Sequence, residues 1–263
     1  LWIEDNHAEI MDGSALWGKG TYAVQKILKE KHGDKVRFVT TGVSGENQCR
    51  NATIITDHEG SATGGFGAVM GSKHLKAIAV LGTGKPEVAR KNELTQLNRH
   101  IMQISKRGTL HMPVPKKQMQ FVKTASCYQC GLECGRGLYR TAAGREEVRK
   151  CQAMALYMPY AGMRPDEPVD TSLDATHICN DYGICTMEVQ NILLWLDACY
   201  KSGILSDEKT GLTYSDIGSV QFIENLIAMI AQRKGFGDIL AEGIRRAGDK
   251  LGEEAKALFN EYT

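Results

Sequence analysis

The residues best suited to chemistry are three cysteines that lie within eight positions near the middle of the chain. Cys127, Cys130 and Cys134 occur in the sequence SCYQCGLECG. A thiolate is a soft ligand, and the CxxCxxxC spacing places three sulfur atoms around one point. The spacing therefore predicts an iron–sulfur cluster, carried by a loop at residues 124–137.

Two alternatives for these cysteines stay open at this point. A tetrahedral zinc site usually shows two paired ligand groups, and the sequence has no second CxxC and no HxxxH to supply the other pair. The three thiols can also be ordinary buried side chains. The absence of a second ligand pair favours the cluster over zinc.

A glycine-rich segment, ATGGFGAVMGSK, precedes a predicted strand and is suited to binding phosphate. Gly64, Gly65 and Gly67 would let backbone N–H groups approach phosphate oxygens closely. The spacing matches neither the Rossmann fingerprint nor the P-loop, so those nucleotide sites are disfavoured. The segment predicts a cradle for a different phosphorylated cofactor, with structural glycines at a sheet corner as the alternative.

A polar segment, GVSGENQCRNA, lies between two predicted strands. Asn47 offers an amide that can bond a ring amide, and Arg50 offers a guanidinium that can bind phosphate. A polar turn between strands explains the same residues.

The elements that must position these segments differ between the two parts of the chain. Four short segments rich in β-branched residues predict strands at 2–5, 35–43, 52–57 and 76–82, with one helix at 16–33 that ends at Gly33. Beyond Gly84 the apolar period changes to that of helices, at 93–107, 185–203, 219–235 and 237–252. We expect an α+β fold in which a β-rich part, 1–90, precedes a helical part, 91–263, that carries the cluster loop.

Composition narrows the classes of function. The chain has 263 residues with 32 basic and 31 acidic side chains, well mixed, so nucleic acid and an anionic membrane surface are disfavoured as partners. No apolar run reaches the length of a membrane span, and eight cysteines are too few for a disulfide-stapled secreted domain. We expect a cytoplasmic protein. Because the chain begins at Leu1 within a strand-like segment, we also expect a piece of a longer polypeptide.

Five motifs together resemble a known family. GxxGENxxR, GGFGAVMGSKHLKAIAV, CxxCxxxC, ICNDYGIC and GDILAEGIRRA follow one another in this order. The series resembles the tungsten- or molybdenum-dependent aldehyde ferredoxin oxidoreductase family over nearly the whole chain. The resemblance implies that 1–90 is the C-terminal portion of a β-rich domain that seats a metal bis-pyranopterin. It also implies that 91–263 is the middle domain, and that the cysteine loop holds a [4Fe-4S] cluster.

Individual positions follow from the resemblance. The family's pterin-binding pattern falls on Asn180, Gly183, Ile184 and Cys185, where asparagine replaces the usual aspartate and keeps an acceptor. In the glycine segment, Thr63 stands at the position of the family's arginine.

The fourth cluster ligand of this family comes from a C-terminal domain. The resemblance therefore leaves this ligand to a segment beyond Thr263, or to a substitute among three other cysteines, Cys49, Cys179 and Cys185.

One departure from the aldehyde-oxidising members lies after the cluster loop. Cys151 stands where they carry a glutamate, which is similar to the tungsten subunit of class II benzoyl-coenzyme A reductase, a branch in which a cysteine faces the metal. We expect Cys151 to be a metal-facing catalytic residue, with ordinary helix packing as the alternative. Glu146 and Glu147 would precede Cys151 by about one helical turn. His177, three residues before Asn180, is a candidate acid or base, or a packed side chain.

The resemblance implies an oxygen-sensitive oxidoreductase that couples two-electron chemistry at tungsten or molybdenum to one-electron transfer through the cluster. Its small-molecule substrate would be an aldehyde, or an activated acid or aromatic acyl thioester, and Cys151 favours the second class. Its partner would be ferredoxin or an iron–sulfur electron-transfer subunit, in an oligomer or a multi-subunit complex. The alternative is a non-catalytic iron–sulfur electron-transfer or scaffold subunit.

Overall fold

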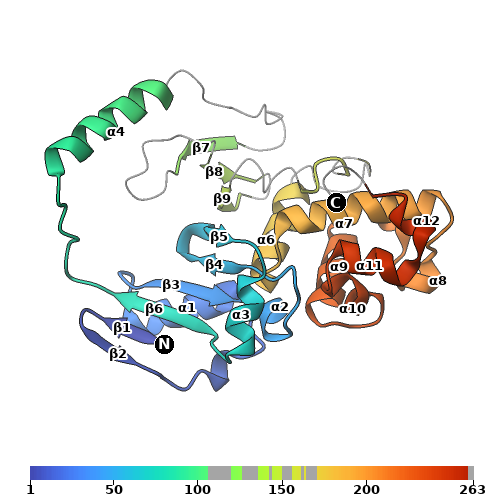
Figure 1. The fold of residues 1–263 in the computed structure, drawn as a ribbon, viewed down its shortest axis with the longest axis horizontal. Helices are drawn as coiled ribbons and strands as arrows, with labels where there is room; N and C mark the ends of the chain where they lie inside the picture. Colours follow the sequence, from blue (N-terminus) through green and yellow to red (C-terminus); the bar gives the residue numbers. More distant parts are fainter. Residues whose placement is uncertain are drawn as a thin grey trace.

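The computed structural model describes residues 1–105, 120–125, 136–141, 144–149, 156–160, 163 and 171–259. A six-stranded sheet with its helices forms a sheet part (residues 1–81), and a group of packed helices forms a helical part (residues 171–259) beside it (Figure 1). This is the α+β fold that the sequence predicts. The predicted ligands Cys127, Cys130, Cys134 and Cys151 lie outside the described residues.

The large sheet is mixed and has the strand order β2-β1-β6-β3-β4-β5. Its strands are β1 (Trp2–Glu4), β2 (His7–Glu9), β3 (Arg37–Thr41), β4 (Ile54–Thr56), β5 (Ser61–Ala62) and β6 (Ala77–Leu81). Strands β1 and β6 are parallel, and the other pairs are antiparallel. All four predicted strands are present, whereas β2 and β5 are short edge strands that the sequence did not predict.

Helix α1 (Thr21–His32) packs on this sheet. It ends at Gly33 as predicted but begins later than residue 16, because Gly18 has a left-handed φ of 78° and residues 14–16 form a separate 3-10 turn. The core between helix and sheet is small, with Trp2, Val24, Leu28, Val36, Phe38, Ala77 and Ala79. A cavity of about 660 Å³ beside α1 is lined by none of the predicted site residues.

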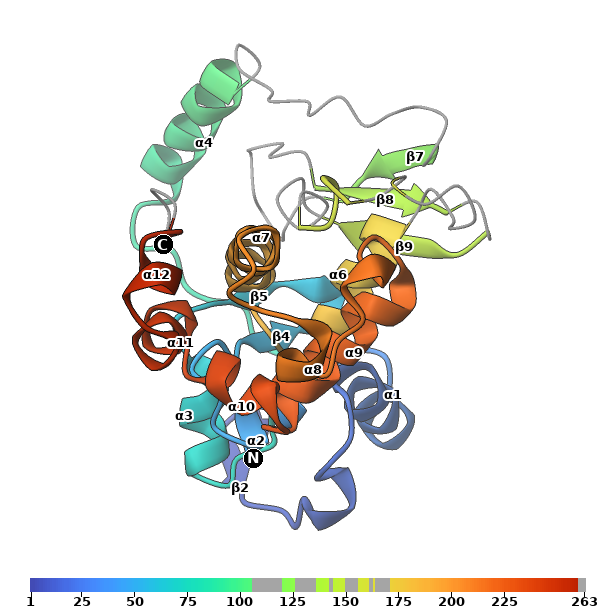
Figure 2. The same ribbon diagram turned by 90° about the vertical axis from the view of Figure 1, so that its right-hand side faces the viewer.

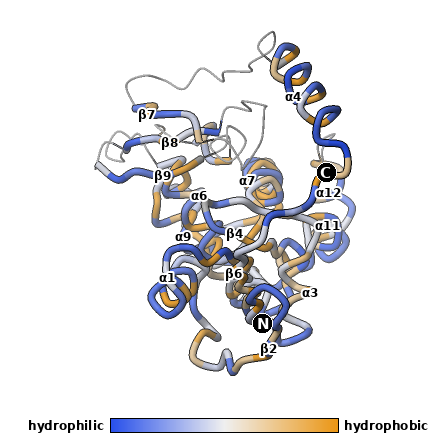
Figure 3. Tube along the Cα trace, turned by 90° about the vertical axis from the view of Figure 1, so that its left-hand side faces the viewer, coloured by the Kyte–Doolittle hydropathy of each residue, from blue (hydrophilic) through white to orange (hydrophobic). Residues whose placement is uncertain are grey.

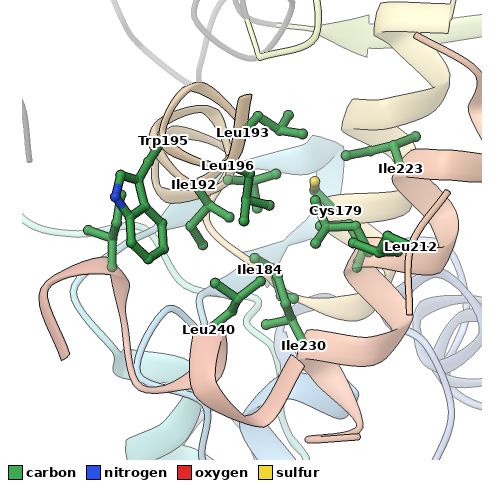
Figure 4. Close-up of a cluster of buried hydrophobic side chains, with 14 of the residues drawn as sticks. Cys179, Ile184, Ile192, Leu193, Trp195, Leu196, Leu212, Ile223, Ile230 and Leu240 are labelled. Carbon is green, nitrogen blue, oxygen red and sulfur yellow. The ribbon is translucent and has the colours of Figure 1, made fainter. Parts of the chain in front are cut away.

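The helical part forms the larger apolar core, which Figure 4 shows in close-up. Its helices are α6 (Thr171–Tyr182), α7 (Thr186–Lys201), α8 (Asp207–Thr210), α9 (Val220–Ala231), α10 (Phe236–Ala241), α11 (Ile244–Leu251) and α12 (Glu253–Lys256). The prediction of one helix over 237–252 is wrong, because Gly243 adopts a φ of 88° and separates α10 from α11.

A second, three-stranded sheet is formed by β7 (Gln120–Thr124), β8 (Gly137–Arg140) and β9 (Glu146–Arg149). This sheet was not predicted from the sequence. Glu146 and Glu147 therefore do not lie on a helix before Cys151, as expected, but on consecutive positions of β9. Side chains at consecutive positions of a strand point to opposite faces, so the two glutamates have different surroundings.

Helix α4 (Lys91–Ser105) confirms the predicted helix at 93–107 up to residue 105 and stands apart from the sheet and helices in both views (Figures 1 and 2). Apolar and polar residues alternate along it (Figure 3), and Leu94, Leu97, Met102 and Ile104 are exposed. No helix among the described residues combines the length and apolar character needed to cross a membrane.

Candidate cofactor-binding site

The predicted cofactor-binding residues gather around one stretch of chain, residues 42–53, called here the junction segment. It contains α2 (Val43–Glu46) and runs between the sheet part and the helical part. Helix α2 lies beside α3 (Phe66–Ser72) and α10 in both ribbon views (Figures 1 and 2). Cys49 and Ala52 of this segment are fully buried in the core of the helical part.

The loop between α6 and α7, which holds Gly183, Ile184 and Cys185, is bonded directly to the junction segment. The backbone N of Thr53 and the hydroxyl of Ser44 both donate to the carbonyl oxygen of Gly183, each at 2.7 Å. The backbone N of Cys185 donates to the carbonyl of Asn51 at 3.0 Å, and Ala52 forms a β-bridge with Ile184. Two of the five motifs are therefore one structural unit.

Gly183 has a backbone reason to be glycine. Its φ is 73°, a left-handed value, and a Cβ on it would lie 2.7 Å from the backbone N of Gly42. Gly42 in turn has no room for a Cβ against the carbonyl of Tyr182. The α6–α7 loop can approach the junction segment this closely because neither residue carries a side chain.

Asn180 and Asp181 lie at the end of α6, against the start of α1. Asn180 is 7% exposed, and its carbonyl accepts a hydrogen bond from the hydroxyl of Thr21 at 2.8 Å. The Asp181 carboxylate accepts from the backbone N of Tyr22 at 3.1 Å. Burial raises the pKa of the Asp181 carboxyl, while this hydrogen bond and the nearby Lys76 ammonium oppose the rise.

The three predicted cradle glycines have different surroundings. Gly64 and Gly65 form a left-handed turn before α3, with φ of 88° and 79°, and a Cβ on Gly64 would meet nothing closer than 3.8 Å. A Cβ on Gly67 would lie 2.6 Å from the carbonyl oxygen of Thr53. Gly67 therefore allows α3 to pack on the junction segment, whereas Gly64 leaves an open approach to the backbone of the turn.

Arg50 is held by the fifth motif, at α10 and α11. Its backbone N donates to the carbonyl of Ala241 at 2.8 Å, and its Nε donates to Glu242 at 3.1 Å. Glu242 also accepts from Arg233 and Arg246, at 2.8 and 3.2 Å. These contacts, that of Arg233 above all, lower the pKa of Glu242 to about 2. The Arg50 side chain remains 55% exposed, which leaves donors of the guanidinium open to an anion.

The side-chain amide of Asn47 is bonded to the end of α9, so its donor is not available to a ligand. Its Nδ2 donates to the carbonyl of Ala231 at 2.8 Å, and its own carbonyl accepts from Arg233 at 2.8 Å. The Sγ of Cys49 donates to the carbonyl of Ile230 at 3.3 Å, and burial raises the pKa of this thiol to about 11. A protonated thiol bonded to a carbonyl is a poor candidate for the fourth cluster ligand.

Sequence reasoning missed two buried polar features of the same site. Lys76 forms a buried ion pair with Glu46 and donates to the carbonyl of Lys19 at 2.7 Å, while Glu46 accepts from the backbone N of Gly18. Burial lowers the pKa of the Lys76 ammonium. Asn51, which is 3% exposed, has both amide atoms unpartnered among the described residues. Glu46 and Asn51 belong to the segment GVSGENQCRNA, but its sequence does not indicate that their side chains are buried.

His177 lies one turn before Asn180 on α6, outside the contacts of the junction segment. Its ring stacks on Tyr22 at 4.2 Å with an interplanar angle of 7°, and its Nδ1 is 3.5 Å from a carboxylate oxygen of the buried Glu147. The Tyr22 hydroxyl donates to Glu59 at 3.0 Å. The imidazole is thus fixed by a ring on one side and beside a carboxylate that can exchange a proton with it.

Cys179 and Cys185 are buried free thiols, and burial raises the pKa of both. Within the described ranges no group of three or more His, Cys, Asp or Glu side chains is arranged to hold a metal ion. The donors that the described residues do present suit an organic, phosphate-bearing group. They are the open turn at Gly64 and Gly65, the exposed guanidinium of Arg50 and the unpaired amide of Asn51.

Comparison with known proteins gives matches over both parts of the chain. Residues 1–82 match the family model of the aldehyde ferredoxin oxidoreductase N-terminal domain, and residues 88–261 match that of domains 2 and 3. The chain is 29% identical to a tungsten-containing aldehyde ferredoxin oxidoreductase of Pyrococcus horikoshii, over 95% of this chain and 48% of the relative. It is 27% identical to the WOR-like subunit of an aliphatic sulfonate oxidoreductase of Pyrococcus furiosus, over 96% and 49%.

Among solved structures, the fold is similar to the active site complex BamBC of benzoyl coenzyme A reductase in complex with 1,5 dienoyl-CoA. The TM-score is 0.77 at 22% identity, covering 98% of this chain and 46% of that one. The chain thus spans about half the length of the curated relatives that it matches.

Proposed function

Because the chain belongs to the aldehyde ferredoxin oxidoreductase family, we propose that it forms part of an oxidoreductase built around a tungsten, or molybdenum, bis-pyranopterin. The observation that carries the proposal is the meeting of four separated motifs at the junction segment. Two hydrogen bonds of 2.7 Å join these motifs, one from Thr53 and one from Ser44, and both are accepted by the carbonyl of Gly183. Such convergence is expected of residues that share one cofactor.

The chain's own residues would bind and orient the cofactor. Backbone N–H groups of the turn at Gly64 and Gly65 and the guanidinium of Arg50 would hold phosphate, while Asn180 and the loop from Gly183 to Cys185 would contact a pterin. When bound, the metal centre supplies the two-electron chemistry, and the protein supplies placement. His177 would hold or deliver a proton at its imidazole, next to the Glu147 carboxylate.

Electron transfer would use a [4Fe-4S] cluster on Cys127, Cys130 and Cys134. In this proposal residues 1–90 form the C-terminal portion of the β-rich pterin-binding domain, and residues 91–263 form the helical middle domain with the cluster loop at 124–137. The electron partner would be ferredoxin or an iron–sulfur subunit, in a cytoplasmic assembly of several chains. The BamBC complex, a multi-subunit relative in fold, supports an assembly of this kind.

For the substrate we favour an activated acid or aromatic acyl thioester that is reduced at low potential. Cys151, at the position of the glutamate of aldehyde-oxidising members, supports this choice, because a thiolate is a stronger donor to tungsten than a carboxylate. The aldehyde is the second candidate, since the P. horikoshii relative is an aldehyde ferredoxin oxidoreductase.

Metal and pterin analysis of protein prepared without oxygen tests the proposal. We expect tungsten or molybdenum together with pterin and iron, and a brown sulfur-to-iron absorption. Iron without tungsten, molybdenum or pterin would instead indicate an electron-transfer or scaffold subunit. Zinc near one equivalent with no colour would overturn both.

A further inference from the structure

Asn51 carries a buried amide that has no partner within the part of the chain that the structure describes. The residue is 3% exposed, and neither Oδ1 nor Nδ2 has a hydrogen-bonding partner. Burying both atoms unpaired opposes folding, because each loses its bonds to water. A polar side chain in this state indicates a partner that comes from outside the described chain.

The position of Asn51 limits what that partner can be. Its carbonyl accepts from the backbone N of Cys185, and the next residue, Ala52, pairs with Ile184. On the other side, a Cβ on Gly65 would lie 3.3 Å from the carbonyl of Arg50. Asn51 therefore follows the residue that contacts the glycine turn, and its own backbone is bonded to the α6–α7 loop.

The neighbouring polar side chains already have partners. Asn47 donates to Ala231, and Arg50 is paired with Glu242. Asn51 is thus the buried side-chain amide of the GENQCRN sequence whose donor and acceptor both have no partner among the described residues, whereas Gln48 is exposed to water.

We propose that Asn51, rather than Asn47, bonds the amide edge of the pterin ring. This inference rests on the proposed function. The ring's pyrimidinone edge presents an N–H beside a C=O, and a carboxamide offers the complementary acceptor and donor. A ring seated between the two loops would draw the amide out of its unpaired position by rotation about its side-chain torsions, and would satisfy both of its atoms.

The test compares Asn51→Leu with the unchanged protein in two states, loaded with cofactor and prepared from cells that make no pterin. In the cofactor-free state we expect the Tm of Asn51→Leu to rise by about 2–4 °C, because two unpaired polar atoms are removed. In the loaded state we expect pterin content per protein, measured by fluorescence after oxidation, to fall about tenfold. Asn47→Leu, which breaks the bond to Ala231, should lower the Tm in both states.

Asn225→Leu, an exposed position of α9, is the control that should keep both Tm and pterin content. Should Asn51→Leu fail to fold, Asn51→Ala removes both the donor and the acceptor with a smaller side chain and should also lose pterin. Normal pterin content in both Asn51 variants would overturn this inference and leave the proposed function intact. A lack of pterin in the unchanged protein would overturn the proposed function and the inference with it.

Discussion

Thr53 and Gly183 are joined by a hydrogen bond of 2.7 Å from the backbone N of Thr53 to the carbonyl of Gly183. The bond ties the last residue of the junction segment to the loop between α6 and α7. Because the carbonyl also accepts from Ser44, its orientation is fixed by two donors. The loop that holds Gly183, Ile184 and Cys185 is therefore held by the sheet part as well as by its own helices.

The destabilisation caused by a side chain between Gly183 and Gly42 can be measured separately from the destabilisation caused by the positive φ of Gly183. Gly183→Ala should lower the free energy of unfolding by about 3 kcal/mol or more, because it adds both a left-handed alanine and a clash with backbone. Gly203→Ala is the matched control, since its φ is 74° and a Cβ there meets nothing within 4 Å. It should lower the free energy by about 1–2 kcal/mol, and equal losses in urea unfolding would contradict the close approach.

The arginine cluster on Glu242 predicts a dependence of stability on pH. The pKa of Glu242 in the folded state, about 2, lies below its ordinary value of 4.5, so its stabilising effect is complete above pH 4.5 and is lost as pH falls towards 2. Glu242→Gln should lower the free energy of unfolding by about 1–2 kcal/mol at pH 7. Between pH 5 and 2 this free energy, here called the acid limb of the stability curve, should fall less steeply than in the unchanged protein.

Chemical denaturation across that pH range measures the effect. Glu224→Gln, at an exposed position of α9, serves as the control and should keep the unchanged acid limb. An acid limb as steep in Glu242→Gln as in the unchanged protein would show that the three arginines do not hold this carboxylate.

His177 can be tested with its stacking preserved. His177→Phe keeps an aromatic ring on Tyr22 but removes both nitrogens, so we expect kcat to fall about 10²-fold or more with little change in Tm. Tyr22→Phe, which loses the bond to Glu59 but keeps the ring, separates the hydroxyl from the stack. If His177→Phe retains full activity and the same pH profile, the imidazole serves packing alone.

The cysteines predict different effects on iron content. Cys127→Ser should remove most of the iron and its visible absorption, because a cluster loses stability without one of its thiolates. Cys49→Ala should keep the iron, since its Sγ is buried, bonded to the carbonyl of Ile230 and has a pKa of about 11. Loss of iron in Cys49→Ala would make Cys49 the fourth ligand after all.

Much of the fold could be predicted because its signals are local. The β-branched segments at β3 and β6 and the helical periods of α7 and α9 are present where the sequence indicates them. The helix predicted over 237–252 is divided at Gly243, since a glycine in a periodic segment does not reveal whether its φ is positive. Strands β8 and β9 have the sequences GLYR and EEVR, which contain only one β-branched residue between them, so their composition does not indicate strands.

The segments of the candidate site were predicted from the sequence and lie together in the structure, but the contacts of their side chains were not predicted. Glycine spacing marked the turn at Gly64, yet only the structure shows that Gly67 serves helix packing instead. Asn47 and Asn51 are chemically identical in the sequence, and their difference depends on the carbonyl of Ala231, which lies far along the chain. Partners that distant leave no local pattern.

The burial of Cys49 and Ala52 within the helical core has a consequence for chimaeras between relatives. The two family matches divide the chain between residues 82 and 88. An exchange made there would combine the helical core of one relative with the residues at positions 49 and 52 of another, which have to pack inside that core. A chimaera that folds has to take residues 42–53 and the helices around them from the same relative.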